Sequence, residues 1–151
     1  MSEPASQTSA AILVSVLVLF PIGFVAFWSF VCLVLGLVSG WMGLAGRCRT
    51  ELPAPAGSDS GVSGMLGFVS YNHVLEVGFA EDGLDLRVMM LFRPGHAPLR
   101  IPWEQVRHEG PAFSLWGRFV KVRLGEGGPL LRLPAEVWAR SGRWMAAPVA
   151  P

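Results

Sequence analysis

The chain has 151 residues, of which 52% are hydrophobic and 15% are charged. This length allows one small folded domain, and so apolar a composition excludes a disordered chain. Two cysteines exclude a disulfide-stapled scaffold, and a formal charge of +1 argues against a nucleic-acid-binding protein. The charges are unevenly placed: of the 12 basic and 11 acidic residues, all except Glu3 lie at Arg47 or beyond.

An uncharged apolar segment covers residues 11–38, after a short N-terminal tail (1–10). Nineteen of its 28 positions are Leu, Ile, Val or Phe. At about 1.5 Å per residue such a helix is about 42 Å long, enough to cross about 30 Å of hydrocarbon with tilt. Pro21 could kink this helix, but the two pieces are too short for two crossings. We therefore predict one transmembrane helix and its interface over 11–44, with Trp41 at the membrane–water boundary.

The tail before this segment has no Lys or Arg, so it lacks the basic start of a signal peptide, and the helix is expected to stay in the mature protein. Arg47 and Arg49 follow the helix directly. By the positive-inside rule they predict a single-pass protein of the cell membrane, with its N-terminus outside and the rest of the chain cytosolic. The lipid bilayer is then its first partner.

Residues 45–64 are predicted to be a linker, because Thr50–Gly64 is rich in Pro, Gly, Ser and Ala. The next segment, 65–143, is long enough for one small core, and 144–151 is expected to be a disordered tail. Within it, apolar and polar residues alternate with the period of two that is typical of half-buried strands.

The expected elements are strands at 74–79 and 84–91 joined by a turn at 80–83, a short strand at 98–103, a hairpin at 113–134 that turns at 125–128, and a closing helix at 135–142. This order predicts an α+β fold. One transmembrane helix precedes a small antiparallel β-barrel or bent sheet of five or six strands, and a short C-terminal helix follows it.

The phrase Ile101-Pro102-Trp103-Glu104-Gln105-Val106 ends a predicted strand, and a hairpin with a glycine turn and a closing helix come after it. In this order the segment 65–142 resembles the small bacterial PH-like modules, which are often fused to a membrane helix. The resemblance implies a seven-stranded barrel closed by a helix, and it transfers no catalytic residues. The whole arrangement also resembles small bacterial membrane proteins that carry no assigned activity.

Motifs for catalysis or metal binding do not occur in the sequence. His73, His96 and His108 are far apart and form no spaced set with a cysteine, and neither GxSxG nor GxxxxGK[ST] is present. We therefore expect no enzyme, no catalytic residues, no cofactor and no metal. The alternative is an enzyme or enzyme subunit whose site is hidden in the sequence; it would use His96 with Arg93 and Glu104.

Charge is divided within the predicted β domain. Residues 51–111 hold eight acids and four arginines, whereas 112–143 hold five Arg and one Lys against two Glu. Arg118, Lys121 and Arg123 lie close along one hairpin, where each could add about 1 kcal/mol of attraction to an anionic leaflet. A solvated strand face is the plainer interpretation. The pattern predicts a membrane-anchored, non-enzymatic module that binds a protein partner or the membrane surface through this basic strip (Arg118, Lys121 and Arg123).

Small residues gather at the end of the apolar segment. Gly36, Gly40 and Gly43, with Ser39 among them, have spacings that suit close pairing of membrane helices. This pattern offers a further alternative, a membrane assembly factor that forms homo-oligomers through its helix.

Overall fold

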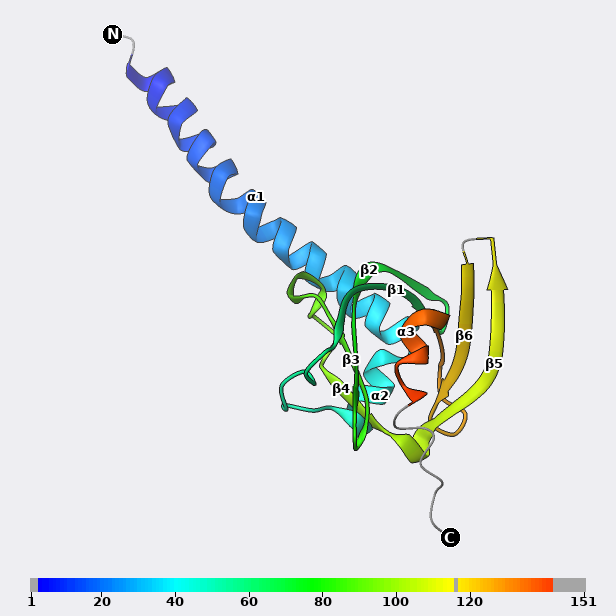
Figure 1. Ribbon diagram of the computed structural model, residues 1–151. Helices are drawn as coiled ribbons and strands as arrows, with labels where there is room; N and C mark the ends of the chain where they lie inside the picture. Colours follow the sequence, from blue (N-terminus) through cyan, green and yellow to red (C-terminus); the bar gives the residue numbers. More distant parts are fainter. Residues whose placement is uncertain (1–2, 116, 143–151) are drawn as a thin grey trace.

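A computed structural model describes residues 3–115 and 117–142 (Figure 1). A long helix, α1 (Glu3–Val38), is followed by a short one, α2 (Trp41–Cys48), then by a curled antiparallel sheet and a last short helix, α3 (Ala135–Ala139). The expected α+β class, the long apolar N-terminal helix and the short C-terminal helix are thus confirmed. The sheet has seven strands in place of the expected five or six.

Helix α1 extends away from the rest of the molecule (Figure 1). Its segment Gln7–Val38 is long and apolar enough to cross a membrane, and Pro21 lies inside the helix without ending it. Residues 7–27 are exposed on every face. The helix ends because Gly40 adopts a left-handed conformation (φ 84°), which glycine tolerates best, and the chain turns back into α2.

The strands of the sheet, in chain order, are β1 (Asp59–Leu66), β2 (Val69–Ala80), β3 (Gly83–Val88), β4 (Leu99–Pro102), β5 (Val106–Ser114), β6 (Gly117–Leu124) and β7 (Leu130–Pro134). Two 3-10 turns, η1 (Met90–Phe92) and η2 (Trp103–Gln105), flank β4. The spatial order is β4-β3-β2-β1-β7-β6-β5, and every neighbouring pair is antiparallel. Two meanders, β1–β4 and β5–β7, therefore join through β1 and β7.

That join is short. Strand β1 pairs with β7 only at Met65 and Leu66, and its register with β2 shifts twice between Ser60 and Gly64. Because of these irregularities the first part of β1 separates from β7. The curled sheet, which forms a half-barrel, is open at this place.

The β2–β3 hairpin is confirmed, with Ala80 paired to Gly83 across the turn. The β6–β7 turn lies where it was expected, at residues 125–128. The sequence pattern missed β1 and most of β5. Gly and Ser dilute the apolar residues of β1, and Gly110 with Pro111 interrupts β5, so neither strand shows a clean alternation.

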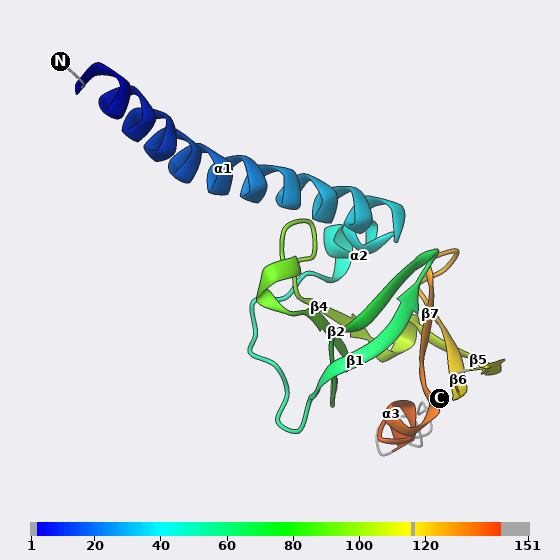
Figure 2. The ribbon, with the colours of Figure 1, turned by 90° about the horizontal axis from the view of Figure 1, so that it is seen from above.

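Helix α2 is part of the core, which corrects the expectation that residues 41–48 form a membrane interface and the start of a linker. Trp41 and Leu44 are fully buried and Cys48 nearly so, packed among the inward-facing leucines and valines of the sheet. The spacing of three and four residues puts these side chains on one face of the helix. The indole N–H of Trp41 donates to the carbonyl of Ala97 at 2.8 Å, and Figure 2 shows α2 between α1 and the sheet.

The segment 49–58, which is part of the predicted linker (45–64), is fastened as a strap across β3 and β4. The Thr50 N–H donates to the carbonyl of Pro98 at 3.0 Å. Arg87 and Arg100 donate to the carbonyls of Leu52 and Pro53 at 2.6 and 3.1 Å. Guanidinium groups on the outer face of the sheet therefore supply the hydrogen bonds that this proline-rich segment cannot make by itself.

Strand β3 is consequently buried on both faces, although its alternating pattern predicts one exposed face. Asp85 has an exposed fraction of 0%, and its carboxylate accepts hydrogen bonds from two guanidinium groups. Arg87 Nε lies 2.6 Å from Oδ1, and Arg100 Nη2 lies 3.0 Å from Oδ2. This buried ion cluster (Asp85, Arg87 and Arg100) connects the strap to the sheet.

Candidate functional site

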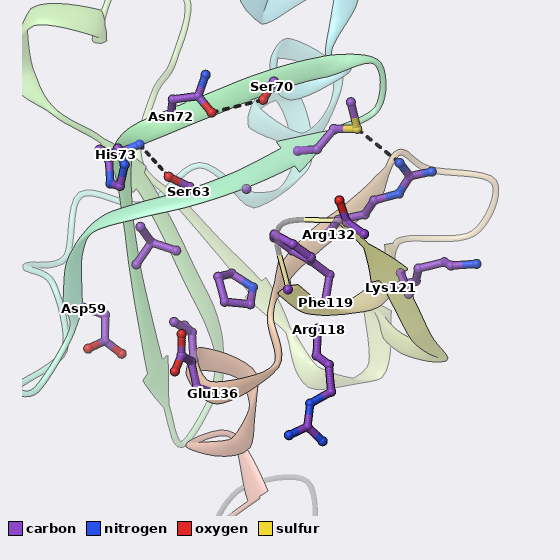
Figure 3. Close-up of a pocket in the computed structure, with 18 of the residues that line it drawn as sticks. Asp59, Ser63, Ser70, Asn72, His73, Arg118, Phe119, Lys121, Arg132 and Glu136 are labelled. Carbon is purple, nitrogen blue, oxygen red and sulfur yellow. Dashed lines mark hydrogen bonds between the residues drawn. The ribbon is translucent and has the colours of Figure 1, made fainter.

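An open groove of about 1300 Å³ lies in the β domain. It lies where β1 separates from β7: β1 and β2 form one wall, β5, β6 and β7 form the other, and α3 closes one end (Figure 3). The groove follows from the short β1–β7 pairing described above, because a continuous ladder would fill this space.

One wall of the groove is basic. It carries Arg118 and Lys121 of the predicted basic strip together with Arg132 of β7, which sequence analysis missed. Lys121 and Arg132 are directly opposite each other in the β6–β7 register. Like charges in such a cross-strand pair destabilise a sheet. An anionic group placed between them would relieve this repulsion.

The third member of the predicted strip lies elsewhere. The Arg123 guanidinium donates two hydrogen bonds to the carboxylate of Glu109 on β5 and does not line the groove. The hydrogen bonds from Arg123 lower the pKa of Glu109 below its ordinary value. Arg123 is therefore already paired, and the basic side chains that line the groove are Arg118, Lys121 and Arg132.

Acidic groups lie toward the other end of the groove. Asp59 begins β1 and forms an ion pair with Arg140, and Glu136 lies in the first turn of α3. The groove is thus positive along β6 and β7, whereas beside α3 the charge of Asp59 is balanced by Arg140.

The opposite wall offers backbone groups. Over Asp59–Gly64, β1 has β2 on one side and no strand partner on its groove side among the described residues. An extended chain can add to such an edge through main-chain hydrogen bonds. Gly61 is exposed and carries no side chain that would obstruct this approach, whereas Gly64 is buried against the Arg132 carbonyl of β7.

His73 lies in the bulge where β2 crosses β1 and is a second residue that sequence analysis missed. Its φ of 56° is left-handed, which costs a non-glycine residue about 1–2 kcal/mol. Its backbone N–H donates to Ser63 Oγ at 3.0 Å, and ring Nδ1 lies 3.3 Å from the Gly61 carbonyl oxygen. Strained positions of this kind concentrate at functional sites, and His73 lines the groove.

His96 is not part of the groove and meets only one of its two expected partners, Arg93. It is buried at the junction of α1, α2 and the loop before β4, whereas Arg93 and Glu104 are exposed. The His96 backbone N–H donates to the Arg93 carbonyl oxygen at 2.8 Å, and both residues line a hollow between α2 and the loop before β4. Within 3–115 and 117–142 no side-chain hydrogen bond or ion pair joins His96 to Arg93 or Glu104. The fold thus brings Arg93 next to His96, whereas Glu104 does not line that hollow.

The His96 imidazole instead belongs to a buried hydrogen-bond chain. Its Nδ1 lies 3.0 Å from the Pro94 carbonyl oxygen, and its Nε2 lies 2.9 Å from the Tyr71 hydroxyl, which is 3.0 Å from Ser39 Oγ. Burial lowers the pKa of His96 from its ordinary 6.5. The ring is therefore mainly neutral at pH 7 and its Nδ1–H donates to the Pro94 carbonyl, while the Tyr71 hydroxyl donates to Ser39 Oγ. This chain connects the end of α1 to the sheet.

The stability of this junction is expected to depend on pH. The unfolded chain binds a proton at His96 near pH 6.5, whereas the folded chain binds it at lower pH. The free energy of unfolding should therefore fall as the pH is lowered through about 6.5 and level off below the folded pKa. Chemical denaturation at a series of pH values measures this change. The variant His96→Gln should flatten the pH dependence of the free energy of unfolding, whereas His108→Gln, at an exposed position, should leave that dependence unchanged. An equal slope in the His96→Gln variant would contradict the assignment.

The glycines proposed for helix pairing are partly covered by the chain itself. A Cβ on Gly36 would lie 2.5 Å from the Gly95 carbonyl oxygen, and one on Gly40 would lie 3.2 Å from Pro129. A Cβ on Gly43 would meet nothing within 4 Å. Gly36 and Gly40 thus permit the end of α1 to approach its own β domain closely. The spacing of small residues in the sequence cannot distinguish this packing from the pairing of two membrane helices.

Among the described residues, no group of three His, Cys, Asp or Glu side chains could hold a metal ion. Fold and site together define a small β domain that follows a candidate membrane-spanning helix and carries an open groove with a basic wall. No protein-family model, no curated protein and no solved structure matches this chain.

Proposed function

We propose that this protein is a membrane-anchored, non-enzymatic module whose PH-like β domain binds an acidic segment of a protein partner in the groove. The α1 helix supports anchoring by its length and apolar surface. Seven strands in two meanders followed by a helix agree with the PH-like resemblance. Arg47 and Arg49, the first cations after α1, favour a single pass with the β domain in the cytosol.

The unfavourable pairing of Lys121 with Arg132 inside the groove is the observation that carries this proposal. An acidic side chain would gain from both cations at once, and the free edge of β1 would hold the backbone of the same segment. The exposed side chain of Phe113, near the end of β5, lines the groove and adds apolar contact area.

The position of the groove favours a protein over the bilayer as its ligand. The groove extends to α3, and α3 lies on the opposite side of the sheet from α1 and α2 (Figure 2). The unpaired edge of β1 also offers main-chain hydrogen bonds, which an extended peptide uses fully and a lipid headgroup does not. The membrane-surface alternative becomes an outcome of the test.

Charge reversal in the groove is expected to weaken peptide binding. The full chain in uncharged nanodiscs would be titrated with a fluorescent ten-residue peptide that alternates Glu with Val and Thr. The double variant Lys121→Glu with Arg132→Glu should raise the dissociation constant about tenfold or more, because each reversal removes an attraction to the acidic peptide and adds a repulsion. Fluorescence anisotropy measures this change.

Arg107→Glu provides the matched control. Arg107 is an exposed cation on β5 outside the groove, so its reversal should change the affinity less than twofold. Equal losses in both variants would show nonspecific attraction and contradict a groove site. Binding to anionic nanodiscs that needs Lys121 and Arg132, with no peptide binding, would favour the membrane-surface alternative.

A further inference from the structure

We propose that the loop Met89–Leu91 enters the membrane beside α1 and forms a second lipid contact of the β domain. This inference rests on α1 spanning the membrane and is independent of the groove. In Figure 1 the loop between β3 and β4 lies against α1, at the side of the domain from which the helix leaves.

The loop is fixed at one position along α1. The indole N–H of Trp28 donates to the carbonyl of Leu91 at 2.9 Å. The Trp28 ring lies 5.4 Å from the ring of Phe92, centroid to centroid. The position of Trp28 in the membrane therefore determines the position of η1.

The length of the free helix places Trp28 at the membrane boundary. Residues 7–27 are exposed on every face, whereas farther along α1 Cys32, Gly36 and Ser39 are buried against the domain. Twenty-one helical residues span about 31 Å, which matches about 30 Å of hydrocarbon. A tryptophan at the next position is at the depth that amphipathic rings prefer.

The side chains of the loop suit this depth. Met89, Met90 and Leu91 have exposed fractions of 53%, 80% and 65%. Three consecutive apolar side chains exposed beside an apolar helix form one continuous surface, which water solvates poorly and the bilayer covers. Arg93 comes directly after the loop and is exposed.

Cationic side chains lie next to the apolar part of the loop. Arg93 and Arg49 line a common hollow of about 470 Å³ between α2 and the loop before β4. Long basic side chains at this depth reach the phosphates of lipid headgroups while their stems remain on apolar surface. The apolar side chains of Met89–Leu91 and the adjacent arginines, Arg93 and Arg49, together identify the bilayer as the occupant of this surface.

Site-specific quenching tests the proposal in the full chain reconstituted into nanodiscs. The native cysteines, Cys32 and Cys48, are both buried, so an environment-sensitive fluorophore can be attached at Met90→Cys, with the parent chain as the labelling control. Lipids brominated near the top of their acyl chains should quench this label several-fold. A label at Leu17→Cys verifies that α1 itself lies in the bilayer.

Glu81→Cys is the matched negative control. Glu81 is exposed in the β2–β3 turn, at the other end of β3, about 20 Å from the loop along the strand. We expect no quenching there. Quenching at Leu17 without quenching at Met90 would overturn the proposal and leave the anchor intact. The proposal would also be overturned if quenching at Met90→Cys disappeared when each nanodisc holds a single chain. In that case a second copy of the chain, and not the bilayer, would cover the loop.

Discussion

Replacement of Trp41 by alanine is expected to unfold the β domain or bring it close to unfolding. Trp41 has no exposed surface, its N–H donates to Ala97, and its ring contacts those of Tyr71 and His96. Truncating a buried aromatic residue costs about 3–5 kcal/mol, which is a large part of the stability of a small domain. Chemical denaturation followed by near-ultraviolet circular dichroism measures the loss.

The adjacent residue provides the control for this experiment. Met42 is in the same helix but partly exposed, so Met42→Ala should change the free energy of unfolding by less than about 1 kcal/mol. A fragment of residues 62–142 lacks α2 and is expected not to fold, whereas residues 39–142 keep the complete core. A stable fold of the shorter fragment would contradict the conclusion that α2 completes the core.

Replacement of Asp85 by asparagine is expected to release the strap and destabilise the sheet by about 3–5 kcal/mol, because it removes the buried carboxylate that Arg87 and Arg100 share. Burial competes with this ion pair, and the hydrogen bond to Asp85 raises the pKa of Arg87. Hydrogen exchange should become faster at the Thr50 amide, which the strap protects, and denaturation measures the free energy.

Two comparison variants separate the ion cluster from a general effect of charge. Asp82 is exposed and lies 3.7 Å from Arg100, so Asp82→Asn should cost less than about 1 kcal/mol. Replacing the entire cluster, Asp85→Leu with Arg87→Met and Arg100→Leu, should recover much of the stability lost in Asp85→Asn. Strap exchange that stays slow in Asp85→Asn would show that the strap is held by other contacts.

The position of α2 also bears on how the membrane and the groove are connected. The end of α1 touches the domain where glycines allow backbones to meet: a Cβ on Gly95 would lie 2.9 Å from Leu33 Cα, and one on Gly67 would lie 2.9 Å from the Ser39 carbonyl oxygen. These contacts and the buried α2 attach the β domain directly to the helix. A partner held in the groove would therefore be held at a defined distance from the membrane.

The sequence by itself determined the features that depend on neighbouring residues. The apolar run of α1, the β2–β3 and β6–β7 turns and the short helix α3 each have a local pattern of hydrophobicity, charge or glycine that predicts them. The basic character of Arg118 and Lys121 was visible for the same reason, since both lie in one hairpin.

Only the tertiary structure decided which surfaces are covered. Asp85 looks like a solvent-facing strand residue until Leu52 and Pro53 are seen to cross over its guanidinium partners. Arg132 joins Lys121 in the groove through strand pairing, and Trp41 leaves the predicted interface because the sheet offers it an apolar cavity. Each of these outcomes depends on segments that are distant in sequence and meet only in the folded chain, so no local periodicity records them.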